Sequence, residues 1–133
     1  KIKSVSSQRM SDAKNVSDTV SIQLLFENGS IASIDYFSNG SKAMDKEFIE
    51  VFSGGFVYQI KDFKELLVYG KSLTKKKFGG QDKGHKSGVF NFISAIKSGG
   101  SSPVGFDEIY NSMKATFKVI ESFKKGGERI SVS

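Results

Sequence analysis

The stretch VSIQLLFENGSIASIDYF, residues 20–37, carries the clearest structural signal in this sequence of 133 residues. Two apolar runs flank Asn28-Gly29, and this dipeptide tolerates the positive φ angles of a type I′ turn. The twist of that turn matches the strands that it joins. The sequence therefore predicts a β-hairpin with strands at 20–26 and 31–37 and a two-residue loop.

The loop length determines which side chains share a face, because side chains alternate along a strand. A two-residue loop pairs Phe26 with Ile31 and Leu25 with Ala32. One face then carries Val20, Ile22, Leu24, Phe26, Ile31 and Phe37, and the other carries Leu25, Ala32, Ile34 and Tyr36. Both faces are partly apolar, whereas a sheet with one free face alternates more cleanly. We expect the second face to be an interface with another subunit or domain.

Further strands are expected on both sides of this hairpin. A short strand at 2–5 precedes a polar loop, and Gly54-Gly55 separates strands at 46–53 and 56–61. Gly70-Lys71 separates strands at 66–69 and 73–78, and residues 129–132 are expected to form a last short strand.

After Gly79-Gly80 the apolar period changes from two to 3.6 residues, which indicates helices. The first helix is expected to begin within 82–85 and to end at Gly99-Gly100, which suit a C-terminal cap. The second is expected to run from Asp107, as N-cap, to about Lys125. We expect its buried stripe to consist of Ile109, Met113, Phe117, Ile120 and Phe123.

Strands followed by helices are typical of an α+β fold. We expect a mostly antiparallel open β-sheet of about six strands, with two helices packed on one face. Residues 1–133 are expected to form a single domain. Because the first residue is Lys1 and not Met, we expect the sequence to be a piece of a longer protein.

The composition excludes several kinds of site. The absence of Cys excludes disulfides and thiolate metal sites, and a single histidine excludes a site built from several histidines. Neither a dinucleotide-binding Gly-rich turn nor a phosphate-binding loop is present. We therefore predict no catalytic, cofactor-binding or metal-binding residue in this chain. No apolar run approaches the ~18–20 residues that cross a bilayer, so we expect a cytoplasmic protein without a membrane partner.

Positive charge is concentrated in residues 71–86. This segment contains six lysines and one acid, and hence five of the six net positive charges. It is interpreted as a solvated edge strand, because lysines on an edge block unwanted strand pairing. An anion-binding patch is the alternative. The segment lacks Arg, and Phe78 is its only aromatic residue apart from the histidine, which disfavours a nucleic-acid partner.

Three residues at the start of the first predicted helix form a candidate site: Lys83, His85 and Lys86. They can line the edge of a substrate pocket, where they and the helix N-terminus would meet an anionic or hydroxylated ligand. The other interpretation is that polar residues here simply satisfy the helix end or contact solvent.

The order of the segments resembles the C-terminal domain of the glucose-fructose oxidoreductase / inositol dehydrogenase (Gfo/Idh/MocA) family. The resemblance covers about residues 18–133. It rests on DTVSIQLLFENGSIASI at 18–34, KEFIEVFSGG at 46–55, DKGH at 82–85 and SFKKGG at 122–127.

This resemblance implies a preceding Rossmann domain that binds NAD or NADP and carries the catalytic lysine. It also implies catalytic Asp and His residues early in the second domain, upstream of Lys1, so that this chain alone would not be catalytic. The implied function is substrate shaping and oligomerisation in an oxidoreductase acting on a sugar, inositol or nucleotide-sugar hydroxyl. The implied partners are the chain's own Rossmann domain and further copies, through the open sheet face. A stand-alone basic module that binds nucleic acid or acidic polysaccharide is the alternative.

Overall fold

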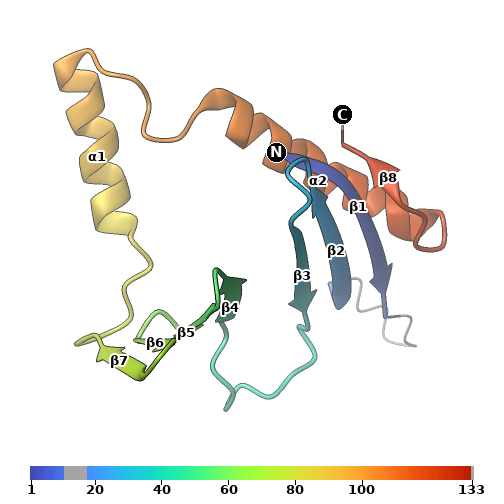
Figure 1. Ribbon diagram of the computed structural model, residues 1–133. Helices are drawn as coiled ribbons and strands as arrows, with labels where there is room; N and C mark the ends of the chain where they lie inside the picture. The colour runs from blue at the N-terminus through green and yellow to red at the C-terminus, as the bar shows by residue number, and fades with distance from the viewer. Residues whose placement is uncertain (11–17, 133) are drawn as a thin grey trace. The chain divides into compact units, whose positions relative to one another are not determined.

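The computed structural model describes residues 1–10 and 18–132, and the chain divides into two compact units (Figure 1). The first unit comprises Lys1–Gly40 and Ser98–Ser133, and the second comprises Ser41–Lys97. Within the described residues, eight strands form two antiparallel sheets of four, accompanied by two helices. The α+β class is confirmed, but the strands form two sheets where one open sheet of about six strands was expected.

The first unit is a sheet with one helix against it. Its strands are β1 (Ile2–Arg9), β2 (Val20–Phe26), β3 (Ile31–Tyr36) and β8 (Ile130–Ser131), in the order β3-β2-β1-β8. Helix α2 (Phe106–Lys124) lies along β1 and β8 (Figure 1). The core between them consists of Val5, Ala115, Ile130 and Val132, with Ile2, Leu24 and Val119 packed against it.

The second unit is a meander followed by a helix. Its strands are β4 (Phe48–Ser53), β5 (Phe56–Lys61), β6 (Glu65–Tyr69) and β7 (Leu73–Lys77), and each pairs with the next in sequence. Helix α1 (His85–Ser98) begins and ends where the sequence predicts, and only Ser98 is assigned to the first unit. All fourteen residues of α1 are described, and none of them is buried.

The loop of the β2–β3 hairpin is one residue longer than predicted. Phe26 N donates to Ser30 O at 2.9 Å, and Gly29 N donates to Phe26 O at 3.0 Å. Gly29 has a φ of 85°, while the Asn28 side chain accepts a hydrogen bond from Ser30 N at 3.1 Å. A turn closed by one left-handed glycine is typical of three-residue hairpin loops. The predicted two-residue loop is therefore wrong.

This change of register regroups the side chains of the hairpin. Leu25 lies opposite Ile31, whereas Ala32 lies opposite Leu24 and Ile34 opposite Ile22. Opposed residues share a face, so Leu25 is on the face opposite to Ala32, Ile34 and Tyr36, and the predicted grouping of these four residues is wrong. Apolar and polar positions separate more cleanly than expected, because Ser21, Gln23, Ser33 and Asp35 lie on the same face as Leu25.

The apolar face of the hairpin is the face that α2 contacts, through β1. Val5 is opposite Leu24, and Ser7 is opposite Ile22. Ser7 Oγ donates to Val119 O in α2 at 2.7 Å. The helix covers the β1 end of this face, while Ile34 and Tyr36 on β3 remain 48% and 58% exposed.

Helix α2 turns a different side to the sheet from the one predicted. Its buried residues are Ala115 and Ser122. Most of the expected stripe is exposed: Ile109, Met113, Phe117 and Ile120. Small side chains allow the helix to approach β1 closely enough for Ser122 Oγ to accept a hydrogen bond from Ser7 N at 2.9 Å.

The start of α2 also differs from the prediction. Gly105 is the N-cap residue, and no side chain caps the helix. Asp107 lies in the first turn, where its carboxylate is 3.5 Å from Lys1 Nζ. A carboxylate in the first turn still interacts favourably with the helix dipole.

Candidate functional site

The three predicted site residues lie in the second unit, where the connection from β7 leads into α1. The helix begins at His85, and both His85 and Lys86 are exposed. Gly84 has a φ of 75°, and its N–H donates to Asp82 Oδ1 at 2.8 Å. The sequence therefore places these side chains correctly at the helix start. Their role toward a ligand stays a prediction.

The connection before α1 is bound to the turn between β5 and β6. Three successive carbonyl groups of that turn accept hydrogen bonds from it. Asp62 O accepts from Gln81 Nε2 at 3.2 Å, Phe63 O from Asp82 N at 3.2 Å, and Lys64 O from Phe78 N at 2.8 Å. We name residues 78–84 the connector. Since one turn holds it at three points, the connector has a defined path into α1.

The turn adopts a backbone conformation that non-glycine residues rarely take. Asp62 and Phe63 have φ angles of 48° and 53°, and Lys64 N donates to Lys61 O at 2.9 Å. Non-glycine residues in the left-handed region cost about 1–3 kcal/mol each, so the surroundings must hold them there. The bonds to the connector supply that support. No glycine marks this turn, and the sequence analysis missed it.

Two carboxylates lie beneath the connector. Asp62 is buried; its Oδ1 accepts a hydrogen bond from Gln81 Nε2 at 2.8 Å, and its Oδ2 pairs with Lys64. The hydrogen bond from Lys64 holds the pKa of Asp62 below its ordinary value, and the same contact raises the pKa of Lys64. The Asp62 carboxylate is therefore ionised and paired with Lys64.

Glu47 is the second carboxylate. Its backbone carbonyl accepts a hydrogen bond from Asp62 N at 2.7 Å, and its Oε1 pairs with Lys83 Nζ. Among the described residues, its Oε2 is a buried atom without a hydrogen-bond partner. Lys83 Nζ also lies 5.9 Å from the centre of the Phe63 ring. Lys83 is thus held against the turn by these contacts, although it is exposed like His85 and Lys86.

The strand order confirms that the lysine-rich strand β7 is an edge strand, because β7 is the last strand of its sheet. Lys75 pairs with Glu65 at 2.9 Å, which lowers the pKa of that carboxyl group. Lys76 lies on the other face, 5.3 Å from the centre of the Phe78 ring. Side chains alternate along the strand, so the lysines of β7 do not all face one ligand.

The β4–β7 sheet has an apolar face that the sequence analysis did not identify. The register brings Ile49, Ile60 and Leu66 side by side, followed by Val51, Tyr58 and Val68. The alternation of apolar residues in β4 and β5 is the signal that could have revealed it. Ile49 and Val51 are exposed, so this face lacks a full cover within its own unit.

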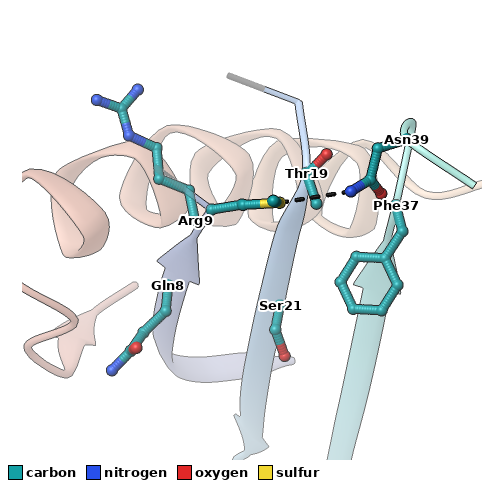
Figure 2. A pocket seen from close by; sticks show the side chains of 7 residues that line it. Gln8, Arg9, Thr19, Ser21, Phe37 and Asn39 are labelled. Atoms are coloured by element: carbon teal, nitrogen blue, oxygen red, sulfur yellow. Dashed lines mark hydrogen bonds between the residues drawn. The ribbon is translucent and has the colours of Figure 1, made fainter. Parts of the chain in front are cut away.

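A shallow hollow of about 360 Å³ lies in the first unit (Figure 2). Seven residues line it: Gln8, Arg9, Met10, Thr19, Ser21, Phe37 and Asn39. Asn39 Nδ2 donates to the Met10 sulfur at 3.4 Å, and the Arg9 guanidinium lies 4.9 Å from the centre of the Phe123 ring. These contacts engage the Asn39 amide and the Arg9 guanidinium with the protein itself.

The described part of the chain contains neither a metal site nor a membrane-crossing helix. No group of three or more His, Cys, Asp or Glu residues is arranged there to hold a metal ion. Neither of the two helices is long and apolar enough to cross a membrane.

Neither a protein-family model nor a curated protein sequence matches this chain. Solved structures do resemble it. An oxidoreductase from Agrobacterium radiobacter, in complex with NAD+, L-tartaric acid and magnesium, is 13% identical with a TM-score of 0.77. Levoglucosan dehydrogenase, in complex with NADH and levoglucosan, is 16% identical with a TM-score of 0.79. Aldose-aldose oxidoreductase from Caulobacter crescentus, complexed with glycerol, is 16% identical with a TM-score of 0.74.

Each of these three matches covers 98% of this chain but only 43%, 45% and 41% of the other protein. The chain thus spans less than half the length of the structures that it resembles. The expected resemblance to the Gfo/Idh/MocA family is confirmed at the level of the fold. This chain has the fold of a domain of such oxidoreductases.

Proposed function

We propose that this chain is the C-terminal, substrate-shaping and oligomerisation domain of an NAD(P)-dependent oxidoreductase. The observation that carries the proposal is the fold, which matches nearly the whole chain to less than half of each oxidoreductase. The remaining half would be a Rossmann domain that binds NAD or NADP. That domain would supply hydride transfer, while the present chain would bind and orient the substrate.

The proposed substrate is a hydroxyl compound of the sugar, inositol or nucleotide-sugar class. His85 and Lys86 stand exposed at the start of α1, and Lys83 is anchored beside them by Glu47. Ammonium and imidazole groups can donate hydrogen bonds to hydroxyl or phosphate oxygens. These three residues would therefore form one edge of the substrate pocket.

Two kinds of partner would cover the apolar surfaces. The face of Val51, Tyr58 and Val68 suits a second copy, because an open antiparallel sheet can pack face to face against another sheet. The exposed stripe of α2 suits the Rossmann domain, since domains of one chain commonly pack through such surfaces.

The test is to purify the complete protein that contains this chain and to follow reduction of NAD+ and NADP+ by absorbance. The probes are myo-inositol, D-glucose and UDP-glucose, one for each proposed substrate class. We expect turnover with at least one probe, and a rise in its KM for His85→Ala but not for Lys71→Ala, a control in the β6–β7 loop. Failure to bind either nucleotide, or absence of turnover with all three probes, would contradict the proposal.

A further inference from the structure

We infer that Gln81 is a positioning residue, which holds the connector against the β5–β6 turn and so keeps His85 and Lys86 at the pocket edge. This inference rests on the proposed function and extends it, because it names the group that fixes the pocket edge. Gln81 itself is not expected to touch the substrate.

Gln81 makes a double contact with Asp62. Its Nε2 donates to the backbone carbonyl of Asp62 at 3.2 Å and to Oδ1 of the same residue at 2.8 Å. Asp62 is only 6% exposed and is fixed in turn by Lys64 and by the carbonyl of Glu47. The side chain of Gln81 therefore attaches the connector to a buried residue of the β5–β6 turn.

Gln81 lies only a few residues along the chain from the candidate site. Asp82 N donates to Phe63 O, Gly84 N donates to Asp82 Oδ1, and α1 begins at the next residue. A displacement at Gln81 passes directly to His85, because the three residues between them leave little chain to absorb it. Gly79 and Gly80, which precede Gln81, have open space around them. The backbone before Gln81 can therefore move more easily than the backbone after it.

The β5–β6 turn is strained at two residues. The left-handed Asp62 and Phe63 direct their carbonyl groups to Gln81 and Asp82. Such backbone persists only where the surroundings over-determine it. The turn and the connector thus stabilise each other, and Gln81 is the side chain that joins them.

The test uses Gln81→Ala in the complete protein, with Gln59→Ala as the matched control. Gln59 Nε2 also donates to a carboxylate, Glu50 Oε1, at 2.6 Å, but this pair lies on the exposed sheet surface. Two measurements are needed: amide hydrogen exchange of residues 78–84, and KM and kcat with the best of the three probes named above. His85→Ala serves as the reference for the pocket edge.

We expect Gln81→Ala to speed exchange in the connector and to raise KM by roughly three- to tenfold, the effect of about one lost hydrogen bond. The KM for the nucleotide should not change, and Gln59→Ala should alter neither measurement. Rescue by Gln81→Asn is not expected, because its shorter side chain would not reach Asp62.

The contrary outcomes separate the two proposals. Unchanged exchange in Gln81→Ala overturns the positioning role. Faster exchange with an unchanged KM also overturns it, provided that His85→Ala raises KM, and the proposed pocket edge then survives. If neither variant changes KM, the pocket edge and the positioning role fall together.

Discussion

Ser122 ties three segments of the first unit together at a single hydroxyl group. The side chain is fully buried. Its Oγ accepts a hydrogen bond from Ser7 N in β1 at 2.9 Å and donates one to Glu128 O, ahead of β8, at 2.6 Å. A hydroxyl group can donate and accept at once, so no apolar residue of similar size could satisfy both backbone groups.

We predict that Ser122→Ala lowers the free energy of unfolding by about 1–3 kcal/mol, because it leaves the N–H of the buried Ser7 without a partner and removes the hydrogen bond to Glu128 O. Urea unfolding followed by circular dichroism measures this change. Thr116→Ala is the control, since its exposed hydroxyl bonds only to Ser112 O within the same helix. Equal losses of stability in the two variants would show that the buried hydrogen bonds of Ser122 contribute no more to stability than an exposed one.

Glu121, the neighbour of Ser122, makes the first unit sensitive to acid. Hydrogen bonds from Lys118 and Lys125 lower its pKa to about 2, from an ordinary value of 4.5. A carboxyl group with a depressed pKa stabilises the folded state fully above its unfolded pKa and loses that contribution as the pH falls. We therefore predict that this stabilisation is complete above about pH 5 and fades between about pH 4.5 and 2.

The urea midpoint of wild type and of Glu121→Gln, measured from pH 7 to pH 2, tests this prediction. The two midpoints should differ at pH 7 and converge at pH 2. Lys124→Ala, at an exposed position of the same helical turn, should follow the wild-type pH profile. A constant gap between wild type and Glu121→Gln at all pH values would contradict the assignment.

At the scale of the element, the end of α2 depends on two glycines in succession. Gly126 N donates to Phe123 O at 3.2 Å, and Gly127 N donates to Ser122 O at 2.9 Å. This pair of bonds defines a Schellman motif, in which the backbone reverses through a left-handed residue. Gly126 and Gly127 have φ angles of 72° and 94°. The motif returns the chain toward β8, and hence toward the core.

The two glycines should respond differently to substitution by alanine. At either position an alanine in the left-handed conformation lowers the stability by about 1–2 kcal/mol. A Cβ atom on Gly126 meets open space, whereas one on Gly127 would lie 3.1 Å from Gln8 Nε2 and 3.4 Å from Ser7 O. We predict that Gly127→Ala is the more destabilising variant, measured as the lower thermal unfolding midpoint. A lower midpoint for Gly126→Ala would show that the close approach to β1 carries no cost.

The strands and helices themselves could be predicted from sequence, but the side that each of them turns toward its neighbours could not. The helices are recognisable from apolar spacing and from the glycines that end them, because both signals are local. The hairpin register depended on whether Asn28 would take a positive φ angle, and a change of one residue moved Leu25 to the other face. The side of α2 that meets the sheet follows from the close approach at Ser122, which the apolar stripe of the helix does not reveal.

The candidate site was predicted only in part, for a similar reason. Lys83, His85 and Lys86 are adjacent in sequence, so a helix start was enough to find them. Glu47, which pairs with Lys83, and Asp62, which binds Gln81, come from distant positions and belong to no short motif. Only the folded second unit brings them together.

At the scale of the whole molecule, apolar surface remains uncovered in each unit. The first unit exposes the α2 stripe, and the second exposes much of one sheet face together with the apolar residues of α1. Large apolar patches of this kind are typical of surfaces that contact a partner. They are consistent with a domain that spans less than half of the proteins whose fold it shares.

The last prediction therefore concerns assembly. Val51 lies on β4, an edge strand of the proposed copy-to-copy face, opposite Tyr58, and is 48% exposed. A lysine there remains solvated within one chain but would be buried without a partner between two copies, which is unfavourable. We predict that the complete protein is an oligomer and that Val51→Lys shifts it toward the monomer, as measured by light scattering during size-exclusion chromatography.

Gln59→Lys is the matched control, because it adds the same charge on the opposite face of the same sheet. It should leave the oligomer intact, and both variants should retain wild-type circular dichroism. A monomeric wild-type protein at high concentration would contradict the assembly role altogether. Equal dissociation by the two lysines would instead place the contact elsewhere, since added charge alone would then account for the effect. Dissociation by Val51→Lys alone identifies the apolar face of the β4–β7 sheet as the surface through which the copies associate.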